Sequence, residues 1–151
     1  MFEDAISVSH LIESHGVLVA ELAALEHLAH HLGGCPGQAA LDNLADSVAT
    51  LPERLAAHMA AEERDVYPAL VDRLGSIEVA SMVDDHREIR QWVERLASVC
   101  DHRTTRGPEL ADVRWTLLVV IGLVSLHLRK EEVAYVRLLG RQVETASSAE
   151  R

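Results

Sequence analysis

The chain has 151 residues and a mass of 16.6 kDa, which suits one domain of ordinary size with its own hydrophobic core. Its 14 Lys and Arg residues are outnumbered by 24 Asp and Glu residues, giving a formal net charge of -10, so we expect no nucleic-acid partner and no membrane partner. Aromatic residues make up only 3% of the chain, which argues against an all-β sandwich or barrel. This composition does not explain the nine histidines.

The amino-terminal segment MFEDAISVSH is acidic and has neither the basic start nor the apolar centre of a signal peptide, which predicts a cytoplasmic protein. The longest apolar stretch, residues 117–126, is about half of the roughly 20 residues that a membrane span requires, so we expect a core helix there. Cys35 and Cys100 do not form a CxxC pair, and we interpret both as inert thiols.

Clusters of helix-breaking residues at 33–37, 75–76 and 104–108 divide the chain into four long segments. In the second segment, Thr50-Leu51-Pro52-Glu53 could start a new helix as a capping box or kink one continuous helix. The apolar periodicity runs through this point and favours the kink. The segments predict an all-α protein, an up-down-up-down four-helix bundle over residues 1–142 followed by a disordered polar tail over 143–151.

Each segment carries apolar residues at alternating spacings of three and four, the pattern of a buried helical stripe. A histidine interrupts every stripe, and in the second and fourth segments a glutamate follows four residues later. The interrupting residues are His15, His58 with Glu62, His86, and His127 with Glu131. A single histidine in a core is usually hydrogen-bonded and not a metal ligand. Two buried carboxylates, however, need a compensating positive charge. No Lys or Arg lies on the stripes to supply it. A metal cation would supply that charge.

Antiparallel packing brings these six residues to one depth in the bundle. With helix ends near residues 4, 73, 77 and 139, all six lie roughly 12 to 22 Å from the same end, at about 1.5 Å per residue. The pattern of one histidine followed by HxxxE occurs twice, which predicts two half-sites and two metal ions. Imidazole with carboxylate suits iron, manganese or zinc. The Glu-x-x-His motif of ferritin-like di-iron proteins is absent.

The segments HMAAEERDVYPAL, DDHREIR and HLRKEE, together with His15, resemble the hemerythrin-like HHE cation-binding domain over essentially the whole chain to about Gly140. The resemblance implies a non-haem centre of two iron ions, with manganese or zinc ranking behind iron. It also implies an open position for O2, hydrogen peroxide or nitric oxide. The implied ligands are the four stripe histidines, His15, His58, His86 and His127, with Glu62 and Glu131 as bridging carboxylates.

One position departs from the oxygen-carrying members, which have a second histidine four residues after the third-helix histidine. This chain has Arg90 there, which argues against reversible oxygen carriage. Tyr135, one turn after the last carboxylate, is the best candidate for completing the centre. Tyr67 points roughly 140° from Glu62 unless Pro68 distorts the helix. Core packing is the alternative for both tyrosines.

The neighbouring residues Glu63 and Glu132 are expected to face solvent or to accept hydrogen bonds from imidazole N–H groups. The other five histidines are interpreted as surface residues, with a weak metal patch as the alternative for three of them, 27, 30 and 31. These five are His10, His27, His30, His31 and His102.

Together these features predict a di-iron protein that binds or reacts with O2, peroxide or nitric oxide, and the lost histidine favours redox turnover such as peroxide removal. The alternative is an iron or oxygen sensor, or an iron-storage module, without turnover. A third hypothesis is an interaction bundle without metal. We expect a monomer or a homodimer.

Overall fold

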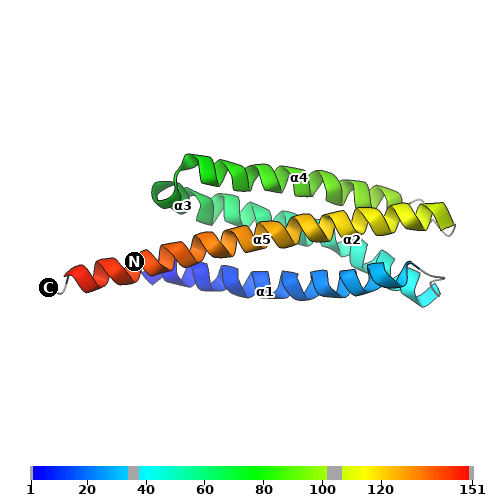
Figure 1. The fold of residues 1–151 in the computed structure, drawn as a ribbon, viewed down its shortest axis with the longest axis horizontal. Coiled ribbons are helices and arrows are strands. Elements are labelled where there is room, and N and C mark those ends of the chain that lie inside the picture. Colours follow the sequence, from blue (N-terminus) through cyan, green and yellow to red (C-terminus); the bar gives the residue numbers. More distant parts are fainter. Residues whose placement is uncertain (1, 34–37, 102–106, 150–151) are drawn as a thin grey trace.

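The computed structural model describes the backbone of residues 2–33, 38–101 and 107–149 and the side chains of 13–33, 42–72, 74–100 and 110–135. All its regular elements are helical (Figure 1). They are α1 (Phe2–His31), α2 (Gln38–Ala61), the π-helical turn η1 (Glu62–Val66), α3 (Tyr67–Leu74), α4 (Ser76–Asp101) and α5 (Gly107–Ala149). The predicted all-α class is therefore confirmed.

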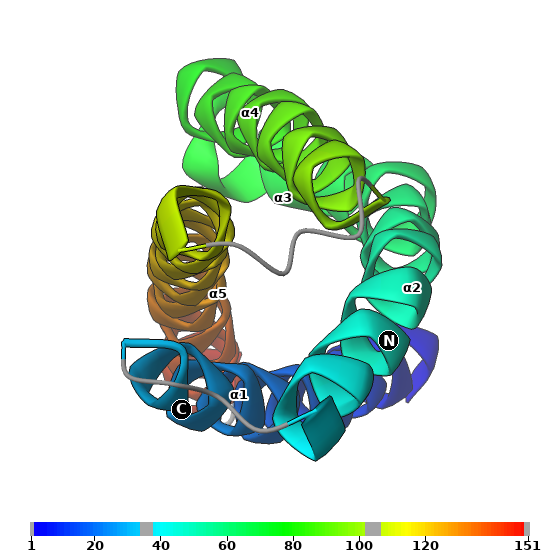
Figure 2. The ribbon, with the colours of Figure 1, turned by 90° about the vertical axis from the view of Figure 1, so that its right-hand side faces the viewer.

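Four helical rods surround one core, with α2, η1 and α3 following one another along the second rod. Successive rods run in opposite directions, so the predicted up-down-up-down order is present (Figure 1). Viewed along the bundle, α5 lies between α4 and α1, and α2 lies opposite α5 (Figure 2). Gly75 makes the sharp connection between α3 and α4 at φ 100°, a conformation that residues with a Cβ rarely adopt.

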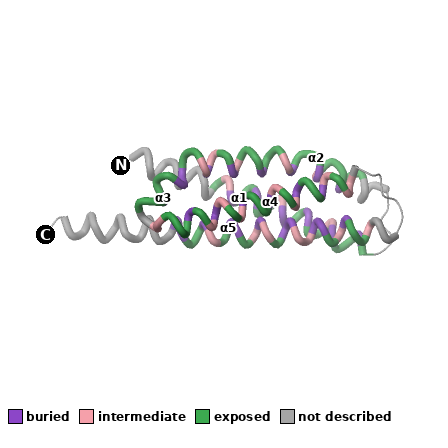
Figure 3. Tube along the Cα trace, turned by 90° about the horizontal axis from the view of Figure 1, so that it is seen from above, coloured by how far each residue is buried: buried purple, intermediate pink, exposed green. Residues whose placement is uncertain are grey.

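Buried residues recur along the inner faces of all four rods, as the periodicity predicts (Figure 3). Most apolar ones form one long cluster that includes Leu22, Leu55, Leu96 and Leu117. A smaller cluster around Tyr67 lies at the α3 end of the bundle. The buried histidines and glutamates lie between the two clusters, so apolar side chains cover them on both sides.

The second rod passes through Pro52 without a break, because α2 continues from Gln38 to Ala61. Thr50 therefore does not start a new helix, and the periodicity correctly indicated continuity. The α-helical pattern changes later, at η1, where the Tyr67 N–H donates to the Glu62 carbonyl five residues back. Pro68 follows directly; it has no N–H to donate and its ring crowds the carbonyl four residues earlier, which a wider turn relieves.

The backbone of α5 is helical as far as Ala149. The helix therefore includes most of the 143–151 segment, for which the polar sequence predicted a disordered tail. Main-chain groups form the hydrogen bonds of a helix, so a polar sequence does not by itself exclude one.

A stretch of α5, Leu110–Tyr135, is long and apolar enough to cross a membrane by length and composition. It extends beyond the shorter apolar run seen in the sequence. Core helices of soluble bundles meet the same criteria, and this stretch carries the buried His127 and Glu131. The absence of a membrane partner stays a prediction.

Candidate metal centre

The six residues predicted to converge come together in one buried layer, and every rod contributes. Five of their side chains are at most 3% exposed, and that of His58 is 9% exposed. Their nitrogen and oxygen atoms form two groups, each with its ligand atoms within 4.8 Å of one another. One group is His15, His58, Glu62 and Glu131, and the other is Glu62, His86, His127 and Glu131. Each group therefore has two imidazoles, and both share the same two carboxylates.

Glu62 lies at the centre of these contacts. Its Oε1 is 3.2 Å from His15 Nε2 and 3.0 Å from His58 Nε2, while its Oε2 is 3.3 Å from His86 Nε2. The Oε2 atom of Glu131 is 3.4 Å from the Nε2 atoms of both His15 and His127. Neighbouring ligands around a metal ion with bonds of about 2.1 Å are separated by about 3 Å, so these spacings fit cation binding.

Two carboxylate oxygens in this layer make no hydrogen bond with any described residue, although both are fully buried. They are Glu62 Oε2 and Glu131 Oε2. A buried carboxylate oxygen without a donor is strongly destabilising, because burial removes the water that would otherwise solvate it. A cation held between the two glutamates would satisfy both oxygens, so this donor set fits a metal ion chemically as well as in spacing.

Two imidazoles have carboxylates behind them that fix their orientation. His86 Nδ1 is 2.8 Å from Glu63 Oε1, and His127 Nδ1 is 3.4 Å from Asp85 Oδ2. Because a carboxylate only accepts hydrogen bonds, Nδ1 is the atom that donates in each ring. The Nε2 lone pair of a neutral ring then points into the metal layer, as in carboxylate–histidine–metal arrangements.

Each of these outer carboxylates is in turn held by a cation. Arg90 Nη2 donates to Glu63 Oε1 at 2.8 Å, and Lys130 Nζ donates to Asp85 Oδ2 at 2.7 Å. Arg90 occupies the position where the oxygen-carrying proteins have a second histidine. Its guanidinium binds the partner of an imidazole instead of offering a ligand atom, since arginine stays protonated.

Charge balance in the metal-free layer changes several pKa values. Burial alone would lower the pKa of His15, but its close contacts with the carboxylates of Glu131 and Glu62 outweigh burial and raise the pKa to about 9. Burial likewise acts to raise the pKa of Glu62, but the surrounding imidazoles hold it well below its usual range. Burial lowers the pKa of His127. A metal ion must displace the proton of His15, so metal affinity falls as the pH is lowered.

Tyr67 lies closer to the glutamates and imidazoles than the sequence suggested. Its hydroxyl donates to Glu131 Oε1 and is 2.9 Å from His86 Nε2. The sequence indicated that Tyr67 could point toward Glu62 only if Pro68 distorted the helix. The wide turn of η1 is that distortion. Tyr135 is also buried, with its ring 5.8 Å from that of His15, but its hydroxyl makes no well-formed hydrogen bond with described residues. The distortion that the sequence allowed for thus brings Tyr67 to the centre, and Tyr135 as the completing ligand stays a prediction.

The remaining predicted residues lie outside the layer. Glu132 is exposed, which is one of the two alternatives expected for these glutamates. Glu63 accepts a hydrogen bond from His86, which is the other alternative. His27 and His31 are exposed, and their rings are 4.3 Å apart. His30 is exposed too, and none of the three belongs to either metal-binding group found among described side chains.

Burial raises the pKa of the Cys100 thiol to about 11, which suits an inert thiol. Three further residues interpreted from the sequence have side chains outside the described residues: His10, Cys35 and His102.

Asp85 is a residue of this site that sequence reasoning missed. We expect Asp85→Asn to weaken metal binding about 10- to 100-fold, because the amide cannot hold the His127 imidazole as a carboxylate does. Titration with metal followed by calorimetry measures this. Asp84→Asn is the matched control, since the Asp84 side chain is exposed and pairs with Arg87. Equal affinities for the two variants would contradict a role for Asp85.

A four-helix bundle with paired histidine and glutamate groups in one buried layer defines a class of protein, the helical cation-binding domains. The family model of the Hemerythrin HHE cation binding domain matches residues 7–139, so the chain belongs to the hemerythrin HHE cation-binding domain family. The family resemblance seen in the sequence is therefore confirmed. Searches of curated proteins and of solved structures found no significant match.

Proposed function

We propose that the chain is a non-haem di-iron protein whose centre reacts with hydrogen peroxide, O2 or nitric oxide, with peroxide removal as its main activity. The two groups of ligand atoms that share Glu62 and Glu131 are the observation that carries this proposal. Two groups argue for two ions, and shared carboxylates would hold them as neighbours. Imidazole with carboxylate is a ligand set that suits iron, with manganese and zinc as the alternatives.

Two iron ions held in this layer would supply the redox chemistry that the side chains themselves lack. The chain contributes position and environment. His15 and His58 would hold one ion, His86 and His127 the other, and the flanking apolar clusters would exclude bulk water. Glu63 and Asp85 would keep the Nε2 atoms of their imidazoles directed inward.

Disproportionation of peroxide needs no further electron donor, because two H2O2 molecules give two H2O and one O2. One peroxide is reduced while the other is oxidised, and all atoms are accounted for. The absence of a second histidine at Arg90 favours turnover over carriage, because the second ion then has one fewer imidazole ligand than in the oxygen-carrying members.

Reconstitution with Fe(II) in the absence of air, followed by addition of peroxide, tests the activity. We expect evolution of O2 at many turnovers per iron pair and loss of that activity in the double variant His58→Ala with His127→Ala. A double substitution at exposed histidines, His27→Ala with His31→Ala, is the control and should keep the activity. Stoichiometric consumption of peroxide that then stops would contradict turnover.

A binding module without turnover is the second candidate, in which iron occupancy itself is the signal or the iron is stored. The direct contact of ligands from all four rods favours it, because metal loss would then loosen the packing between helices. Turnover of peroxide supports the enzyme, whereas stoichiometric binding with a change in helix packing supports the module.

Tyr67 is the additional ligand that we now propose in place of Tyr135. Its hydroxyl already contacts Glu131 and His86, and burial followed by the charge of Glu131 raises its pKa, so it is protonated without metal. Fe(III) loading should deprotonate it and produce a visible phenolate-to-iron charge-transfer band. Tyr67→Phe should lose the band and Tyr135→Phe should keep it. Retention of the band in Tyr67→Phe would contradict this role.

A further inference from the structure

The outward face of α5 carries a mostly apolar stripe that the rest of the described chain leaves largely uncovered. Its members recur at spacings of three and four residues: Trp115, Val119, Gly122, Leu126, Arg129 and Val133. Leu126, Trp115 and Val133 are 66%, 55% and 50% exposed. No acidic residue lies in the stripe, although the chain has 24 of them. A mostly apolar stripe without acids, interrupted only by Arg129, on a chain of net charge -10, is typical of an interaction site.

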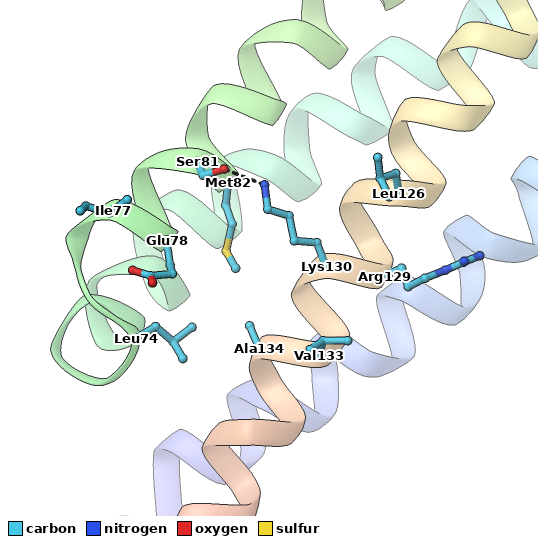
Figure 4. A pocket seen from close by; sticks show the side chains of 10 residues that line it. All are labelled: Leu74, Ile77, Glu78, Ser81, Met82, Leu126, Arg129, Lys130, Val133 and Ala134. Atoms are coloured by element: carbon cyan, nitrogen blue, oxygen red, sulfur yellow. Dashed lines mark hydrogen bonds between the residues drawn. The ribbon is translucent and has the colours of Figure 1, made fainter.

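One end of this stripe borders an open groove between α4 and α5, with a volume of about 680 Å3 (Figure 4). Its walls are mostly apolar, and the Ile77 side chain at its rim is 81% exposed. Lys130 reaches from α5 toward α4, where it donates to Ser81 Oγ (Figure 4). The apolar lining residues are Leu74, Ile77, Met82, Leu126, Val133 and Ala134.

The other end of the stripe carries a protruding aromatic residue, Trp115. Its indole packs edge-on against Trp92 of α4, with ring centroids 5.4 Å apart, and leaves more than half of the side chain exposed. The groove and Trp115 therefore both lie on the α4 side of α5, at opposite ends of one stripe. A cavity and a projection placed in this way complement each other after a rotation of 180° about an axis across the middle of the helix.

We propose that this face binds a second copy of the chain, with the two α5 helices packed antiparallel across a two-fold axis. In this dimer the Trp115 end of one stripe lies against the groove end of the other. Trp115 of each copy then faces Val133 and the groove of the other copy. Leu126 then faces Gly122, near the axis. Because both copies use the same surface, one knob-and-hole contact is made twice.

Gly122 supports this register. A Cβ at Gly122 would meet no atom within 4 Å, so the fold of a single chain does not require glycine there. Glycine in a helix interior weakens the helix relative to alanine, so it needs another reason. In the proposed dimer the missing side chain makes room for Leu126, the most exposed apolar side chain of the stripe, and lets the two helices approach closely.

Sedimentation equilibrium of the full chain over a concentration series tests the proposal. We expect the mass of a dimer, and we expect Leu126→Glu to raise the dissociation constant at least about thirtyfold, as for a central interface residue. Val17→Glu on α1 is the matched control, because Val17 is 61% exposed and lies on another rod. Circular dichroism verifies that each variant keeps its helices.

The register has its own test. Gly122→Leu should prevent association by filling the hole, whereas Gly16→Leu should not, since Gly16 is another helical glycine with open space around it. Adding Leu126→Ala to Gly122→Leu exchanges knob and hole and should restore the dimer. A chain that stays monomeric overturns the proposal, and so does a dimer unaffected by these variants. Monomers that bind lipid vesicles through Leu126 would overturn it in favour of a membrane surface.

Discussion

Replacing Glu62 by glutamine is expected to abolish tight metal binding at both groups, with affinity reduced by more than about 100-fold. Loss of a partner outside the ligands already weakens metal sites 10- to 100-fold, and Glu62 itself belongs to both groups of ligand atoms. The amide is neutral and cannot balance a cation in this buried layer. Glu131→Gln should behave in the same way, because Glu131 is the other shared carboxylate.

Metal content per chain after loading and desalting measures this effect. The matched control is Glu132→Gln, one residue from Glu131 but exposed, which should retain the wild-type metal content. Retention of one ion in Glu62→Gln would show that the two groups bind independently. Full retention of metal would rule out Glu62 as a shared ligand.

Removing the metal should destabilise the folded chain by a large amount. Ligands bound only to the native state stabilise it by about 4 kcal/mol for one site when the free metal is at 1,000 times its dissociation constant. For a chain of this size that corresponds to about 8 to 16 °C in Tm. The physical reason is that the buried oxygens of Glu62 and Glu131 lose their cation while remaining inaccessible to water.

Thermal unfolding with and without a chelator gives the difference in Tm. The double variant His58→Ala with His127→Ala is the control, because it should unfold at the same temperature under both conditions. A wild-type chain whose Tm does not respond to chelation would contradict a structural contribution from the metal.

The fold could be predicted because its signals are local and repeated. Glycine and proline clusters separate the rods, and the three-and-four spacing of residues such as Leu22 and Leu117 identifies the face that each rod buries. The convergence of the six polar residues followed from the same stripes, because antiparallel rods with short connections fix the depth of each residue.

The outer partners could not be predicted in this way. The pairing of Asp85 with His127 depends on how α4 and α5 are rotated against each other, which one sequence does not specify. The position of Tyr67 depended on a distortion at Pro68 that the sequence left open. An expectation based on 3.6 residues per turn fails where a π-helical turn precedes a proline, and Pro68 was the only local sign of that distortion.

Elemental analysis of the chain reconstituted with Fe(II) without air tests the central claim most directly. The two groups of ligand atoms predict two iron ions per chain, and the double variant His58→Ala with His127→Ala should bind fewer than one. A wild-type chain that binds one ion or none under these conditions would contradict a di-iron centre.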